Sequence, residues 1–101
     1  MKTLYICEGF ETRVEIIKGG CRHEDFLRLK EQRDALYLFD FGGFFVAYDD
    51  DAKKVVSAFN NTTLDKVKGY HLTTLRSTIA GGIALKVAEL QRKGHEVVIV
   101  R

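Results

Sequence analysis

The chain of 101 residues contains no proline, no tryptophan, one methionine and two cysteines. With 46% hydrophobic residues and no low-complexity run, it is typical of one packed domain and not of a disordered segment. It has no run of about 18 apolar residues, so a membrane-spanning helix is not predicted. The N-terminus also lacks the basic and apolar regions of a signal peptide. We therefore expect a cytoplasmic protein that makes no contact with a membrane.

Cysteine and histidine are too few and too dispersed to suggest a metal site. Cys7 and Cys21 have no metal-ligand spacing and no export signal beside them, which favours two reduced thiols over a disulfide. The three histidines fall in separate segments without a cysteine or histidine at zinc-like intervals. No metal and no cofactor are expected.

Charge is distributed unevenly along a chain whose formal net charge is only +2. Residues 1–51 carry a net charge of −4 and residues 52–101 a net charge of +6. Such asymmetry suggests a basic side, which is one feature of proteins that bind nucleic acids. Lysines that simply solvate helix faces would produce the same count, and the two interpretations stay open.

The most informative segment is a pair of glycines, Gly42 and Gly43, between two runs of aromatic and β-branched residues, 36–41 and 44–48. Glycine supplies the positive φ angles of tight hairpin turns, so the segment predicts a β-hairpin. Opposed residues in a hairpin share a face. One predicted face holds Tyr37, Phe39, Phe41, Phe44, Val46 and Tyr48, and the other holds Leu36, Leu38, Phe45 and Ala47 with Asp40.

The remaining segments predict further strands and helices. Strands are expected at 3–7, 12–17, 70–75 and 96–100, and helices at 24–32, from 52 to 59, and along a stripe that starts at Ile79 and ends before Gly94. Residues 60–68 are polar and predict a loop. This order indicates an α+β fold in which about three helices pack on a single mixed sheet of about five or six strands.

Three aspartates, Asp49, Asp50 and Asp51, directly precede the apolar stripe of the second helix. Carboxylates at this position can cap the first turn and meet the positive end of the helix dipole, and this interpretation is preferred. The alternative is a magnesium-dependent nuclease that would use Asp40 together with the three aspartates. No His, Lys or Glu motif completes a recognisable catalytic set, so no catalytic residue is assigned and the chain is not expected to be an enzyme.

Three segments resemble the N-terminal mismatch-recognition domain, domain I, of the DNA mismatch repair protein MutS. They are residues 26–32 with 42–52, where a Leu-Lys helix precedes a strand, a glycine turn and an acidic helix start, and the closing residues 87–100. The resemblance implies one domain over residues 1–101, in which 20–101 are MutS domain I-like and 1–19 form an N-terminal β-hairpin addition.

In that family a phenylalanine wedges into the duplex from the minor groove, and a glutamate two residues later binds the base. The resemblance places Phe44 at the wedge, while Val46 stands where the family carries glutamate and Gly43 where it carries aspartate. Valine has no side-chain hydrogen-bonding group, so stacking would act without base readout. The predicted DNA-binding residues are Phe44, Gly42, Gly43 and Val46 at the matched turn, together with the basic residues Lys53, Lys54, Lys66, Lys68 and Arg76, which we expect to contact the DNA backbone.

The sequence thus predicts a non-enzymatic module that binds distorted or mismatched double-stranded DNA through an aromatic wedge. It would work without ATPase activity, because the chain contains no Gly-x-x-x-x-Gly-Lys-Ser/Thr motif. The alternative is a protein-interaction or homo-oligomerisation module that uses the aromatic hairpin face, since valine in place of glutamate makes this face more apolar.

Overall fold

A computed structural model describes residues 2–7, 10–76 and 82–101 of the chain, with side chains from residue 12 onward within these ranges. Its helices and strands follow one another as β1 (Lys2–Cys7), β2 (Phe10–Ile17), α1 (His23–Gln32), β3 (Leu36–Asp40), β4 (Phe45–Tyr48), α2 (Asp49–Ala58), β5 (Asp65–Val67), β6 (Tyr70–Leu75), α3 (Ile83–Arg92) and β7 (Val97–Val100).

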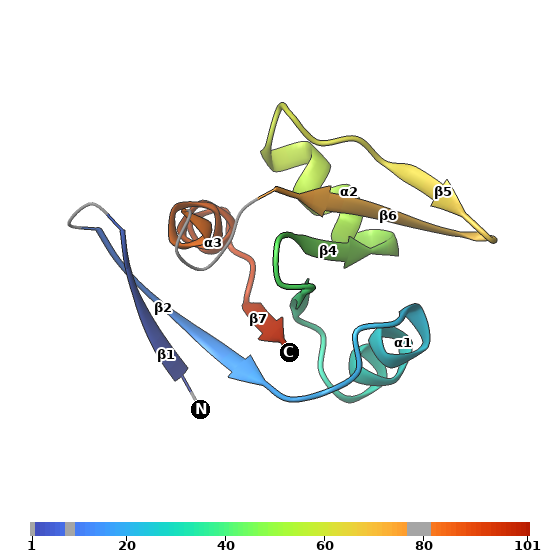
Figure 1. Cartoon of the computed structure of the whole chain (residues 1–101), viewed down its shortest axis with the longest axis horizontal. Helices are drawn as coiled ribbons and strands as arrows, with labels where there is room; N and C mark the ends of the chain where they lie inside the picture. The colour runs from blue at the N-terminus through green and yellow to red at the C-terminus, as the bar shows by residue number, and fades with distance from the viewer. Residues whose placement is uncertain (1, 8–9, 77–81) are drawn as a thin grey trace.

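The described strands form one mixed sheet in the order β1-β2-β7-β3-β4-β6-β5. The last strand of the chain, β7, lies between β2 and β3 and is parallel to both, while the other neighbours are antiparallel. Figure 1 shows α1 on one side of the sheet and α2 with α3 on the other. The predicted α+β class, with a mixed sheet and three helices, is confirmed.

Strand β5 lies inside the segment that was predicted to be a loop. Its three residues are all exposed and two of them are charged, so no hydrophobic alternation marks the strand. They form a strand because Lys68 and Gly69 both have positive φ angles, 49° and 89°, which turn the chain back onto β6 in register with Tyr70–Leu72. Ile79, the predicted start of the last helix stripe, lies outside the described residues, and α3 begins after Gly82.

Both faces of the sheet are covered by helices. Leu36, Leu38, Phe45 and Ala47 pack with α2 and α3, as the predicted hairpin faces suggested. The opposite, aromatic face packs against Phe26 of α1, and its buried residues are Tyr37, Phe39, Val46 and Tyr48. The prediction that this whole face could meet a partner is therefore wrong for these four residues, because α1 takes the place of the partner.

The three aspartates occupy the first turn of α2, but no side chain caps it, and the N-cap residue is Tyr48. The predicted side-chain cap is therefore wrong, whereas the predicted placement of acidic residues in the first turn, at the positive end of the helix dipole, is confirmed. The side chain of Asp51 is instead fully buried and accepts hydrogen bonds from the backbone amide of Tyr37, at 2.9 Å, and from Lys30 Nζ, at 3.0 Å. Asp51 thus links α2, on one face of the sheet, to strand β3 and to α1 on the other face.

We expect Asp51→Asn to destabilise the protein by about 3 kcal/mol, because it leaves the partly buried Lys30 without its buried counter-charge. The matched control is Asp50→Asn, where the side chain is 83% exposed and its pairing with Lys53 is a surface contact. Urea unfolding followed by circular dichroism measures both. Equal midpoints for the two variants would contradict the structural role of Asp51.

Candidate nucleic-acid interface

The β3–β4 turn forms a braced tip at one end of the sheet. Phe39 pairs with Val46 as predicted, and the amide of Phe41 donates to the carbonyl oxygen of Phe44 at 3.0 Å. Gly42 has a φ angle of 96°, and its amide donates to Asp40 Oδ1 at 2.8 Å. Because backbone and side-chain hydrogen bonds close the turn on both sides, the residues at the tip have defined positions.

The tip carries two exposed phenylalanines. Phe41 is 45% exposed and Phe44 is 38% exposed, so neither residue belongs to the core. Their rings are parallel, with centroids 5.3 Å apart and an interplanar angle of 3°. This offset-stacked arrangement is one that aromatic pairs prefer, and it presents an apolar surface to solvent.

Val46 lies in the interior, although it was predicted among the DNA-binding residues. Its side chain is 6% exposed and packs in the aromatic cluster with Tyr48 and Val98. Its strand is central, since β4 is hydrogen-bonded to β3 on one side and to β6 on the other. The prediction that Val46 contacts DNA is therefore wrong, because the tip projects past this residue.

Of the five predicted basic contacts, only Arg76 lies at the tip. The last pair between β4 and β6 is Phe45 with Leu75, so Phe44 and Arg76 follow it as neighbours at the same end of the sheet. Arg76 is exposed.

The four predicted lysines lie toward the other end of β4 and β6. Lys66 pairs with His71 of β6, and Lys68 is in the turn beyond that pair. Lys53 and Lys54 belong to the first half of α2, which begins where β4 ends. The lysines of α2 are also close to carboxylates, at 3.8 Å from Asp50 and 4.0 Å from Asp51 respectively. The structure therefore does not gather these lysines around Phe44.

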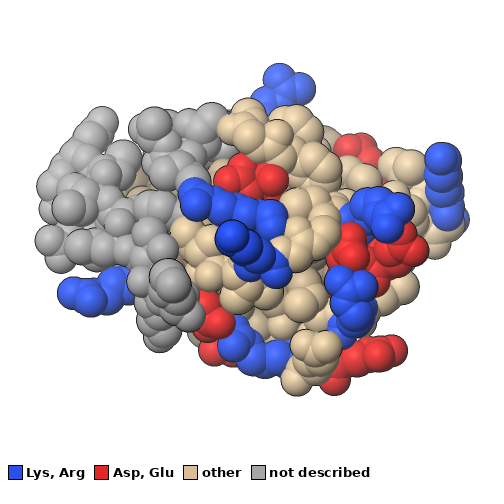
Figure 2. Space-filling model, turned by 60° about the horizontal axis from the view of Figure 1, so that its bottom comes forward, with Lys and Arg blue, Asp and Glu red and all other residues tan. Residues whose placement is uncertain are grey.

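Basic and acidic side chains alternate on the face that Figure 2 presents, where most groups of lysine and arginine adjoin Asp or Glu.

Arg101, which sequence reasoning missed, is one basic residue near the tip, with its Nε 3.5 Å from Asp40 Oδ2. It reaches this position through the parallel pairing of β7 with β3, a tertiary contact that no local pattern signals. Phe41 was also missed as a site residue, although its predicted pairing with Phe44 was a usable signal.

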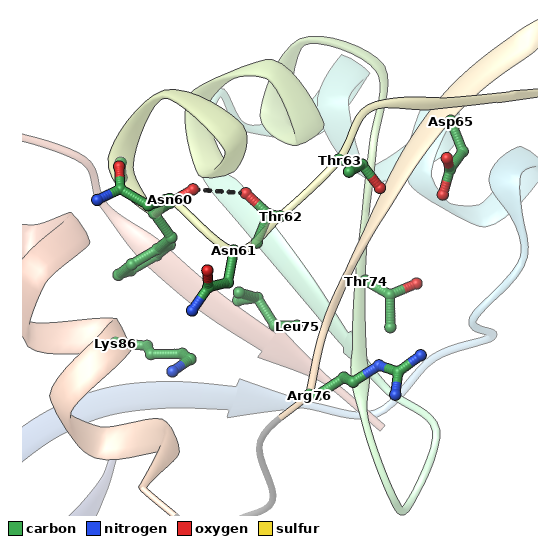
Figure 3. Close-up of a pocket in the computed structure, with 11 residues that line it drawn as sticks. Asn60, Asn61, Thr62, Thr63, Asp65, Thr74, Leu75, Arg76 and Lys86 are labelled. Atoms are coloured by element: carbon green, nitrogen blue, oxygen red, sulfur yellow. Dashed lines mark hydrogen bonds between the residues drawn. The ribbon is translucent and has the colours of Figure 1, made fainter.

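An open pocket of about 850 Å³ includes Arg76 in its lining and lies at the end of β6. It lies between the α2–β5 loop, the end of β6 and α3, and its lining is mostly polar. Figure 3 shows Lys86 pointing from α3 toward the loop that carries Asn61, and Arg76 projecting from the end of β6 on the other side. Thr62 Oγ1 donates to the carbonyl oxygen of Phe59 at 2.8 Å and stabilises the loop.

The structure separates the acidic residues of the nuclease alternative. Asp40 is at the tip, whereas Asp49 and Asp51 lie at the opposite end of β4 and accept hydrogen bonds from His23 and Lys30 respectively. Among the described residues, no group of three or more His, Cys, Asp or Glu side chains could hold a metal ion.

None of the described helices is long and apolar enough to span a membrane.

The fold and the tip together define a small α+β domain with an aromatic hairpin at one end of a mixed sheet. A comparison with protein families matches residues 22–101 to MutS domain I. The chain therefore belongs to the MutS domain I family, which is a family of DNA-binding domains associated with mismatch recognition and not of catalytic ones. The hairpin of β1 and β2 precedes the matched residues. Searches of curated proteins and of solved structures gave no match.

We expect Gly42→Ala to destabilise the protein by about 1 kcal/mol, because an alanine at a φ angle of 96° is strained even though space is available. Gly43→Ala is the matched control, since a Cβ there also meets nothing within 4 Å and its φ angle is not in the left-handed region. Thermal unfolding of both variants checks the prediction. A larger loss for Gly43→Ala would show that the turn has another geometry.

Acid should weaken the contact between α1 and α2. Burial opposes ionisation of Asp49, but hydrogen bonds from His23, at 2.6 Å, and from the amide of His71, at 3.1 Å, outweigh it and hold the pKa of Asp49 below its ordinary value. A lowered folded-state pKa contributes stability above the unfolded-state pKa, and this contribution is lost as the pH falls through the folded-state pKa.

We therefore expect Asp49→Asn to lose less stability than the unmodified protein between about pH 5 and pH 2. Asparagine tolerates the positive φ angle of residue 49, so the backbone is preserved. Urea midpoints measured across this pH range, with Asp50→Asn as the control, test the expectation. Parallel pH curves for Asp49→Asn and the unmodified protein would refute it.

Proposed function

We propose that this chain is a cytoplasmic, non-enzymatic DNA-binding module that binds distorted or mismatched duplex through Phe44. The observation that carries the proposal is the exposure of Phe44 on a glycine turn in a domain of the MutS domain I family. A core aromatic would have no access to a ligand. An aromatic ring beside two glycines can approach a duplex closely, because glycine adds no side chain at the point of contact.

A wedge of this kind favours DNA that is already weakened. Inserting an apolar side chain unstacks a base step and costs a few kcal/mol, and the cost is smallest where a base is mismatched or unpaired. Because residue 46 is a valine and is buried, the chain has no acidic side chain at the family's glutamate position. The preference would therefore come from the deformability of the DNA and not from hydrogen bonds to a particular base.

Affinity for the backbone would come from the basic residues at the tip. Arg76 follows the last β4–β6 pair, at the same end of the sheet as Phe44, and Arg101 lies on the β7 side near Asp40. Phosphate contacts of this type position a protein on the duplex without selecting a sequence. The chain lacks the Walker A motif, so we propose that it binds DNA without ATP-driven signalling.

The alternative function, a protein-interaction or homo-oligomerisation module, is confined to a smaller surface than the sequence suggested. Of the aromatic hairpin face, Phe41 and Phe44 remain exposed. This two-ring patch is the observation that keeps the alternative open, because exposed aromatic clusters occur at interfaces.

Phe44→Ala should abolish most of the preference for distorted DNA, with a loss of about five- to hundredfold for mismatched or bulged duplex, because one stacked base contributes about 1–3 kcal/mol. Arg76→Ala should weaken binding to matched and distorted duplexes equally. It should also reduce the slope of the logarithm of affinity against the logarithm of salt concentration by about one. Fluorescence anisotropy at two salt concentrations measures both effects. Leu85→Ala, an exposed apolar residue on α3, is the matched control.

No binding to matched, mismatched or bulged duplex near physiological salt would refute the proposed function. Light scattering of the same samples addresses the alternative. Self-association that Phe44→Ala abolishes, together with absent DNA binding, would establish the interaction module in place of the DNA-binding one.

A further inference from the structure

The two rings at the tip are not equivalent, because each has a different neighbour. Phe41 follows β3 and Phe44 precedes β4, and the next strand across the sheet is β6, which ends beside Arg76. The order across this end of the sheet is therefore Phe41, Phe44, Arg76. Phe41 stacks in parallel on Phe44 from the β3 side, so the accessible ring face of Phe44 is the one turned toward β6 and Arg76.

The stack is held in place before any ligand arrives. The Phe41 amide bonds the Phe44 carbonyl oxygen, and the Asp40 side chain bonds the Gly42 amide while lying 3.5 Å from the guanidinium of Arg101. The backbone on both sides of the turn is thus fixed. A pre-formed arrangement of this kind saves the entropy of ordering the rings during binding.

The number of stacked rings limits the DNA structures into which the tip can be inserted. Consecutive bases in one strand are spaced by about 3.4 Å, which is the thickness of one aromatic layer. A single ring that intercalates needs two free faces, and it separates two neighbouring base pairs by the thickness of one aromatic layer. Two stacked rings need about two layers, roughly 7 Å, and continuous duplex must then unstack twice as far.

We propose that Phe41 and Phe44 form a one-sided stacking platform, and that its ligand is DNA with a base face already exposed, as at a one-nucleotide gap. Because one base is missing at such a gap, the space for one of the two ring layers is present without any unstacking. The base at its edge stacks on Phe44, and Arg76 lies beyond it with guanidinium donors for a phosphate or a base edge. This inference rests on the proposed function and specifies its DNA substrate.

The experiment compares three labelled duplexes of one sequence, which are matched, singly mismatched or interrupted by a one-nucleotide gap, with both ends blocked by streptavidin. We expect the gapped duplex to bind about tenfold more tightly than the mismatched one. Phe41→Ala should narrow this difference, because the freed face allows Phe44 to intercalate alone. Phe44→Ala should abolish the gap preference.

The controls separate stacking from folding. Phe41→Leu keeps apolar volume without a planar ring, and Leu27→Ala removes an exposed apolar side chain from α1. Thermal unfolding of each variant verifies the fold. Equal or tighter binding of the mismatched duplex, or an equal loss for all three duplexes in Phe41→Ala, would overturn the one-sided platform and leave DNA binding intact. Binding to none of the three would refute the proposed function itself.

Discussion

The buried carboxylate of Asp51 ties α2 to β3 and to α1 through its hydrogen bonds. It lies where β4 ends and α2 begins, and it accepts a hydrogen bond from the backbone of β3 and another from Lys30 of α1. Burial raises the pKa of Asp51, while these hydrogen bonds oppose the shift. A charge in this position is costly unless it is paired, so the three elements must meet in one arrangement.

That arrangement leaves the hairpin tip as the exposed part of the aromatic segment. The sheet is covered by α1 on one face and by α2 and α3 on the other, and the strands β3, β4 and β7 are buried between them. Apolar residues that continue past the end of the sheet are only partly covered, and Phe41 lines an open pocket beside the start of α1. Phe41 and Phe44 are in this position, and their mutual stacking reduces the apolar area that each exposes.

Local chemistry made the hairpin predictable. Two glycines between aromatic runs indicate both the turn and the register, and the observed pair of Phe39 with Val46 follows directly. The helices were predictable from apolar spacing for the same reason. Strand β5 was not, because its residues carry no pattern and its formation depends on a turn with a lysine at positive φ.

The candidate site was only partly predictable. Phe44 was identified through its glycine turn and its resemblance to a known wedge. Val46 was assigned to the DNA-binding residues through the same resemblance, and strand alternation does not say which face of the hairpin a helix will cover. The lysines of α2, of β5 and of the turn after β5 lie toward the end of β4 and β6 that is opposite the tip. In the sequence these lysines and Arg76 all belong to the basic residues 52–101.

The local elements, the turn and the α+β class follow from the amino-acid sequence, because these depend on φ preferences and on the spacing of apolar residues. Tertiary packing settles which face of the hairpin is buried, which basic residues reach the tip and what the acidic residues of α2 contact. Strand order and helix placement bring together residues far apart in the chain, as Asp40 meets Arg101. The energies that select such contacts arise from burial and pairing across the whole fold.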